Sequence, residues 1–352
     1  MYNKRKQKGL VMLKTEIKNR NIPGLKSREE MLEIIQNEEY GRIIPSPENV
    51  NFIVSEELVP RFCANKATLH KIIAECVING KEFSFPFYAA VPVEKKKHPF
   101  FVHINFRDEN PDRYQPTEEI IDNGFAVLTV CYKDVTSDDE DFTNGLAGVL
   151  FPDGKRNETD PGKIAMWAWA ASRVLDYAER NEEWFDIEKS VVCGHSRLGK
   201  TALFAGASDE RFKFSYSNDS GCAGAAIARG NKGEDIEAIC DRFPFWFCEN
   251  YKKYMKNENA MPFDQHYLVA SIAPRYVLIG SAKEDAWADP VSEQLCCEAS
   301  SPAFNKPFEC NNRFASVGDE FFSGDIGYHM RKGTHYFSRE DWQKLIKFVL
   351  SK

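Results

Sequence analysis

Short apolar runs alternate with amphipathic stretches along the chain from about residue 100 onward. Runs of this length and composition predict buried strands, and they occupy residues 100–106, 125–132, 190–194, 212–219, 276–282 and 325–333. Segments with helical spacing lie between and after them, at residues 117–122, 163–181, 197–207 and 338–350. Hydrophobic strands that alternate with helices predict an α/β fold with a mostly parallel central sheet and helices on both faces.

The first hundred residues have a different pattern. Ser27 and Glu30 form a capping-box sequence ahead of an apolar stretch, which predicts a helix over 27–37. Two β-prone runs within 69–92 flank Asn79-Gly80, a strong signal for a two-residue hairpin turn. We therefore expect antiparallel strands at an N-terminal edge of the sheet. Without repeats or an obvious linker, the simplest organisation is an N-terminal extension, 1–45, and one α/β domain, 46–352.

Composition narrows the function classes. The chain has 352 residues, 43% of them hydrophobic, and a formal net charge of −7, so nucleic acid is not an expected partner. No segment approaches 18 consecutive apolar residues, so no membrane partner is expected. Residues 1–25 lack the apolar stretch of a secretion signal. This predicts a cytoplasmic location, in which the ten cysteines would be reduced.

One strand leads directly into a serine and then into a helix. Residues 190–194 are apolar, Ser196 follows, and Arg197 begins the next helical segment. This is the context of a nucleophile elbow, which needs small neighbours such as Gly194 and Gly199. The spacing is G-x-S-x-x-G rather than the usual G-x-S-x-G, so a serine N-cap with a packing glycine is the alternative.

A nucleophilic serine needs a base. In a fold of this kind the base follows the last strand and precedes the last helix, where His335 stands. His329 lies inside the predicted last strand and His266 precedes an apolar helix, so both are interpreted as structural. His195 adjoins the serine, and its side chain is expected to point elsewhere.

The acid that would orient the histidine has two candidates. Asp285 follows the strand 276–282, which gives the order nucleophile, acid, histidine along the chain. Asp219 follows the preceding strand, and its loop reaches the same edge of the sheet. Glu284 and Asp289 lie close enough to compete with Asp285. The residues alone leave the choice open, although we favour Asp285.

Nine blocks of sequence resemble carbohydrate esterase family 15, the glucuronoyl esterases, and its bacterial branch in particular. The blocks are PTEEIIDNGFAV (116–127), MWAWAASRVLDY (166–177), GHSRLGKTALFAGASDERF (194–212), SNDSGCAGAAIARGNKGE (217–234), FPFWF (243–247), DQHYL (264–268), APRYV (273–277), EDAWADP (284–290) and GYHMRKGTH (327–335). The resemblance extends over nearly the whole chain, from about Tyr40 to Trp342. The Ser-Arg-x-Gly-Lys elbow and the Trp-Ala-Asp-Pro segment are its most specific parts.

The resemblance implies an α/β-hydrolase fold and assigns roles. Ser196 matches the nucleophile, His335 the histidine, and Arg197 the arginine that supports the oxyanion. The family places its acid on either of two loops, which correspond here to Asp219 and Asp285.

The resemblance also assigns Lys200 and Trp287, and more weakly Glu234, to binding of the glucuronate. Two features depart from the family. Its well-studied members are secreted, and its fungal members carry a cysteine beside the nucleophile and another after the histidine. Here those two positions hold His195 and Tyr336, so that bridge cannot form.

Together these features predict a serine esterase that hydrolyses small-molecule or oligosaccharide esters of (4-O-methyl-)glucuronic acid, as in lignin–carbohydrate or glucuronoxylan fragments, through an acyl-enzyme. The chemistry needs no metal and no organic cofactor. The first alternative is an acetyl-xylan esterase or another acyl hydrolase on the same fold. The second is a carbohydrate-binding protein without catalytic activity.

Overall fold

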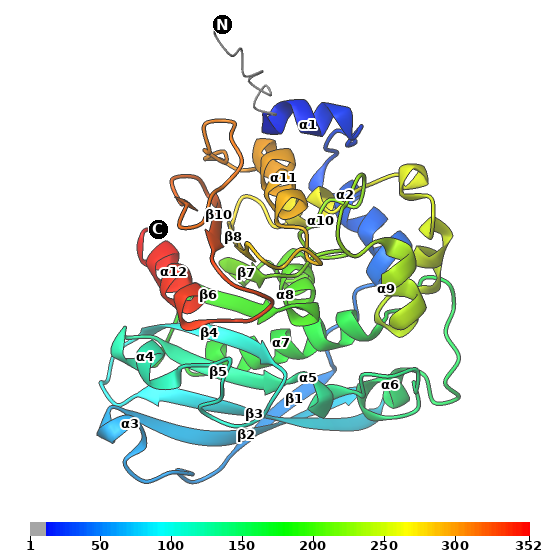
Figure 1. Ribbon diagram of the computed structural model, residues 1–352. Coiled ribbons are helices and arrows are strands. Elements are labelled where there is room, and N and C mark those ends of the chain that lie inside the picture. Colours follow the sequence, from blue (N-terminus) through cyan, green and yellow to red (C-terminus); the bar gives the residue numbers. More distant parts are fainter. Residues whose placement is uncertain (1–11) are drawn as a thin grey trace, which may run out of the picture.

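A ten-stranded mixed sheet forms the centre of the computed structural model, which describes residues 12–352 (Figure 1). The strand order is β1-β2-β3-β5-β4-β6-β7-β8-β10-β9. The strands are β1 (Asn49–Val54), β2 (Ala67–Ile78), β3 (Lys81–Pro92), β4 (His98–Asn105), β5 (Ala126–Cys131), β6 (Phe185–His195), β7 (Phe214–Asn218), β8 (Tyr276–Ala282), β9 (Glu320–Phe321) and β10 (Ile326–Arg331).

The middle of the sheet is parallel, and both of its edges are antiparallel. Strands β5, β4, β6, β7, β8 and β10 run parallel to one another, whereas β1, β2, β3 and β9 pair antiparallel with their neighbours. The predicted hairpin is confirmed, because Ile78 pairs with Lys81 across the turn. Asn79 and Gly80 both have positive φ, 52° and 70°, as a two-residue turn of type I′ requires.

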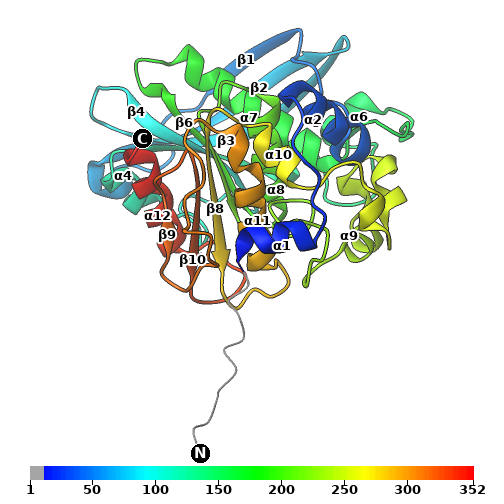
Figure 2. The same cartoon turned by 90° about the horizontal axis from the view of Figure 1, so that it is seen from above.

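Helices cover both faces of the sheet, which confirms the predicted α/β architecture (Figure 2). Helices α7, α8 and α11 bury their apolar side chains in the larger core, on one face. Helices α4 and α12 pack into a second core, on the other face. The α-helices are α1 (Leu13–Asn19), α2 (Arg28–Ile35), α3 (Phe62–Asn65), α4 (Thr117–Asp122), α5 (Tyr132–Val135), α6 (Gly145–Leu150), α7 (Lys163–Arg180), α8 (Arg197–Ser208), α9 (Ile236–Arg242), α10 (His266–Ala270), α11 (Pro290–Ser300) and α12 (Arg339–Leu350).

Residues 12–48, ahead of the sheet, are packed onto the rest of the protein. Ser27 caps α2 through the predicted capping box with Glu30, and a π-helical turn, η1 (Gln36–Tyr40), continues the helix. Leu13 and Ile35 are fully buried in the larger core. These two side chains share their core with residues of the sheet. The predicted division at residue 45, between an N-terminal extension and the α/β domain, stays a prediction.

A long excursion, residues 219–275, connects β7 to β8. It contains α9, α10 and three short 3-10 helices, η2 (Pro244–Trp246), η3 (Glu249–Tyr254) and η4 (Glu258–Ala260). Its hydrophobic spacing follows no single period, so the sequence pattern predicted no elements between residues 220 and 265. It lies over the carboxyl ends of the parallel strands and supplies one wall of the site described next. Among the described residues, no helix combines the length and hydrophobicity needed to cross a membrane.

Candidate active site

Ser196 stands on a sharp turn between β6 and α8. Its backbone has φ 57° and ψ −127°, a conformation that costs free energy for a residue with a side chain. The turn is tight enough that a Cβ at Gly194 would lie 2.2 Å from the carbonyl oxygen of Leu198. A Cβ at Gly199 would lie 2.9 Å from the hydroxyl of Ser217. Both glycines are therefore needed for close packing of the strand, turn and helix, as in a nucleophile elbow.

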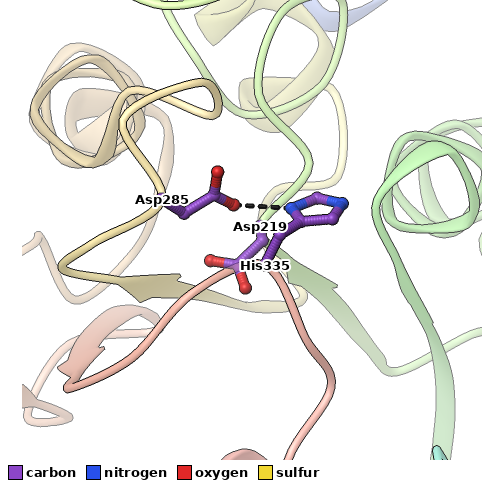
Figure 3. Close-up of side chains that lie close together, drawn as sticks. All are labelled: Asp219, Asp285 and His335. Carbon is purple, nitrogen blue, oxygen red and sulfur yellow. Dashed lines mark hydrogen bonds and ion pairs between the residues drawn. The ribbon is translucent and has the colours of Figure 1, made fainter.

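His335 lies in the loop between β10 and α12 and is paired with Asp285. Its Nδ1 is 2.6 Å from Oδ2 of Asp285, the length of a charge-assisted hydrogen bond. Asp285 is 5% exposed, and its other oxygen accepts from the amide of Ala288 at 3.3 Å. Figure 3 shows the second ring nitrogen of His335 directed away from both nearby carboxylates. Among residues 12–352 that nitrogen has no hydrogen-bond partner, so it can exchange a proton with a nucleophile.

Asp219 lies beside this pair but is engaged elsewhere. Its Oδ1 accepts from the amide of Ala282 at 2.6 Å, and its Oδ2 accepts from Arg331 at 3.1 Å. Burial raises the pKa of the Asp219 carboxyl, and the Arg331 guanidinium opposes that shift. Ligand atoms of Asp219, Asp285 and His335 lie within 4.8 Å of one another. A guanidinium already bound to one of these carboxylates is unfavourable for a metal cation, so we interpret the group as a catalytic acid–histidine pair with a neighbouring ion pair.

A cavity of about 160 Å³ opens above the serine and the histidine. Every predicted site residue lines this cavity except Asp285, which is hydrogen-bonded to Nδ1 of His335 outside the lining. The lining residues are Ser196, Arg197, Lys200, Asp219, Ser220, Gly221, Glu234, Arg242, Phe243, Trp246, Trp287, Ala288 and His335. A larger cavity of about 620 Å³ lies between residues 43–50, α7 and the end of α8, and it contains none of the predicted site residues.

Arg197 is the first residue of α8, directly after the serine. In the described part of the chain its backbone N–H has no hydrogen-bond acceptor, so it can donate to an oxyanion at the positive end of the helix. Its guanidinium forms an ion pair with Asp138 and lies 4.6 Å from the ring centroid of Trp246. This arrangement keeps the cation at the cavity wall, next to the nucleophile.

Three further predicted residues surround the cavity. Lys200 is 3% exposed, and its ammonium donates to the carbonyl of Ser220. Burial lowers the pKa of Lys200, while the carboxylate of Glu234 acts in the opposite direction. Trp287 is 51% exposed at the rim and presents a large flat apolar surface with one polar N–H. The cavity therefore combines side chains of both charge signs in its lining with an aromatic surface at its mouth.

His195 does not line the cavity, as expected, but its ring packs against His335, a contact that the sequence did not predict. Its ring centroid lies 4.4 Å from that of His335, and its Nδ1 is hydrogen-bonded to Oδ1 of Asn218 at 2.7 Å. Burial, together with His335, lowers the pKa of His195 well below 6.5. A neutral neighbour adds no like charge when His335 is protonated during catalysis. His329 and His266 are both buried, as expected of structural histidines.

Four residues near the cavity were missed by the sequence reasoning. Asp138 accepts from Arg197 and, at 2.8 Å, from the indole N–H of Trp246. Phe243 stacks on Trp246 with centroids 3.9 Å apart, and Arg242 lines the same wall. The only signal available beforehand was the aromatic cluster of residues 243–247, for which the sequence pattern indicated no role in the site.

Comparison with known proteins relates most of the chain to one family. Residues 75–306 match the family model described as glucuronyl esterase, fungi. A carbohydrate esterase named MZ0003, from an unknown prokaryotic organism, is 38% identical over 247 residues, covering 66% of this chain and 54% of the relative. The 4-O-methyl-glucuronoyl methylesterase 1 of Phanerochaete chrysosporium is 28% identical over 206 residues, covering 55% and 43%. The chain thus spans about half the length of these curated relatives.

Solved structures match over nearly the full length. The glucuronoyl esterase from Solibacter usitatus has a TM-score of 0.83 and 30% sequence identity, covering 93% of this chain and 92% of that one. A structure described as a promiscuous CE15 esterase from a marine bacterial metagenome has a TM-score of 0.81 and 28% identity, covering 92% and 90%. The similarity of the fold and the similarity of the sequence therefore indicate the same family.

Proposed function

Because this chain belongs to the glucuronyl esterase family, we propose that it hydrolyses esters of glucuronic acid or its 4-O-methyl ether. One observation carries the proposal. A single cavity is lined by Ser196 on a strained elbow and by His335, which Asp285 holds at 2.6 Å from behind. Several curated relatives are named 4-O-methyl-glucuronoyl methylesterase, which supports the same acyl group here.

The chemistry proceeds in two balanced halves. His335 donates its Nδ1–H to Asp285 and accepts the proton of the Ser196 hydroxyl at its other nitrogen, while the serine oxygen attacks the ester carbonyl carbon. The carbonyl oxygen becomes an oxyanion, which the backbone N–H of Arg197 stabilises. His335 then protonates the leaving alkoxide, and the sugar acid remains as an acyl-enzyme. Water repeats the sequence and releases the carboxylic acid and the free serine.

The other side chains that line the cavity would recognise the sugar. Trp287, half-exposed at the rim, offers a flat surface for the C–H face of a pyranose. Lys200 and Glu234 offer one charged donor and one charged acceptor for sugar hydroxyls inside the cavity. Arg197 adds a planar guanidinium with several N–H donors at the cavity wall. A small acetyl group would leave most of these contacts unused.

The test is a comparison of acyl groups. We expect turnover of methyl and benzyl esters of 4-O-methyl-glucuronate, weaker turnover of methyl galacturonate, which inverts one hydroxyl, and the weakest turnover of an aryl acetate. Ser196→Ala serves as the control for background hydrolysis. A kcat/KM on the aryl acetate above that on the glucuronate esters would refute the proposal and favour a general acyl hydrolase. Absence of all hydrolysis would favour a binding protein.

A cytoplasmic location stays a prediction. All ten cysteine thiols are unpaired in the structure, and nine of them are buried. Free thiols are stable in a reducing compartment, and this observation is what supports the prediction.

A further inference from the structure

The guanidinium of Arg331 binds two buried carboxylates at the end of β10. Its Nε donates to Oδ2 of Asp341 at 2.7 Å, and its Nη2 donates to Oδ2 of Asp219 at 3.1 Å. Arg331 is 3% exposed, and both aspartates are at most 1% exposed. A buried arginine is tolerated when such partners satisfy its charge and its donors. These contacts anchor the guanidinium between β7 and the first turn of α12.

The same guanidinium also holds the backbone of the loop that carries His335. Its Nη2 donates to the carbonyl of Thr334 at 3.1 Å and to the carbonyl of Tyr336, and its Nη1 donates to the carbonyl of Lys332 at 3.1 Å. Thr334 and Tyr336 are the residues on either side of the histidine. The planar guanidinium therefore fixes both peptide groups adjacent to His335 in a defined geometry.

Asp219 extends this network to the loop of the acid. Its other oxygen accepts from the amide of Ala282, the last residue of β8, three positions before Asp285. Asp219 itself follows β7 directly and has a positive φ of 45°, which turns its carboxylate toward these partners. One carboxylate and one guanidinium thus connect the loops after β7, β8 and β10.

We propose that Arg331 is a positioning residue that holds His335 in register with both Asp285 and the nucleophile, and that Asp219 acts on the histidine through Arg331 rather than directly. The inference rests on the proposed function only in its use of Ser196 and His335 as a reacting pair. The loop from 332 to 336 has no regular secondary structure of its own. Without the guanidinium, three carbonyls would lose their donor, and the ring would sample orientations away from the serine.

The chain contains a matched control for a purely structural role. Arg229 is also buried, pairs with buried Asp264 at 3.0 Å, and donates to the carbonyls of Met261 and Phe263, both at 2.6 Å. It does not line the cavity of the candidate site. Arg331→Lys and Arg229→Lys therefore both remove buried contacts to carboxylates and backbone carbonyls, a larger set beside the histidine and a smaller set away from it.

The experiment uses two readouts that do not depend on the identity of the ester. One is the rate at which a fluorophosphonate probe labels Ser196, and the other is the proton NMR resonance of the His335 Nδ1–H in its hydrogen bond to Asp285. Both lysine variants should lose stability to chemical denaturation. Only Arg331→Lys should label about 10²-fold more slowly, as expected for a misplaced catalytic group, and shift or broaden the histidine resonance. Arg229→Lys should match the wild-type protein in both.

Asp219→Asn covers the case in which Arg331→Lys does not fold. The amide keeps an oxygen for Ala282 and removes the charge that anchors Arg331, so labelling should slow by about tenfold, a loss near 1.4 kcal/mol. Equal losses in the Arg331 and Arg229 variants, or an unchanged resonance and labelling rate in a folded Arg331 or Asp219 variant, would overturn the inference. A wild-type protein that labels at Ser196 without hydrolysing glucuronate esters would instead contradict the proposed substrate alone.

Discussion

Replacing Glu39 with glutamine should remove a strong pH dependence of stability. Glu39 lies in η1 and is fully buried. Its Oε1 accepts from Nε2 of Gln265 at 2.9 Å, while Oε2 of Glu39 and Oε1 of Gln265 have no partner among the described residues. Burial raises the pKa of Glu39 from 4.5 to about 8. The folded protein therefore keeps this carboxyl protonated at pH values where the unfolded chain ionises it.

The sign and size follow from proton linkage. Between pH 4.5 and about 8 the folded state binds more protons at this position than the unfolded state, so stability falls as pH rises through that window. At about 1.4 kcal/mol for each unit of pH, the wild-type protein should lose about 4 kcal/mol relative to Glu39→Gln between about pH 5 and pH 9. The glutamine keeps the acceptor for Gln265 and carries no ionisable group.

The assay is urea unfolding at a series of pH values, with a thiol reductant throughout. The difference in unfolding free energy between the two proteins isolates Glu39, because Glu293, whose pKa is also raised by burial to about 8, is present in both. The control is Glu38→Gln, which removes a carboxylate from the same turn at a position that solvent reaches. Parallel curves for the wild type and Glu39→Gln would show that Glu39 is ionised in the folded protein and would refute the reasoning.

Four further predictions concern the site and the thiols. Ser196→Ala should lower kcat by about 10⁴-fold or more without changing the circular dichroism spectrum; a residual rate above about a tenth of wild type would exclude this nucleophile. Arg197→Ala and Arg197→Lys should lower kcat by about 10²–10³-fold, and an effect on KM alone would mean ground-state binding. Asp285→Asn should lower kcat by about 10⁴-fold and Asp219→Asn by far less; the reverse order would make Asp219 the acid. Titration of the denatured, unreduced protein should detect nearly all ten thiols, and two or more disulfides would contradict the predicted compartment.

Local patterning was sufficient for the regular elements around the site. The strand 276–282 was predicted with the bounds of β8, and the helices predicted at 117–122 and 197–207 agree with α4 and α8 to within a residue. The helix predicted at 338–350 is α12, which Ser338 caps. A buried parallel strand needs a continuous apolar run and a helix needs a cap and a periodic face, so these elements are encoded within about ten residues of sequence.

The choice between the two candidate acids was not encoded in this way. Asp219 and Asp285 each follow a parallel strand and so reach the same sheet edge. Asp285 rather than Asp219 bonds to His335 because the carboxylate of Asp219 is bound by Arg331. Arg331 lies 112 residues from Asp219 in the sequence. Only the pairing of β10 beside β8 brings that guanidinium into place.

The structure of the excursion between β7 and β8 could not be predicted from the sequence pattern either. Phe243 and Trp246 have no periodic spacing, and their place at the cavity depends on contacts with Arg197 and Asp138. The regular elements, the elbow and the histidine thus followed from patterns of short range, because side-chain periodicity, capping and turn signals are local, whereas the order of the strands became known only from their pairing in the sheet. The acid, the cavity wall and the position of His195 depend on side chains distant in sequence, whose contacts exist only once the sheet has assembled.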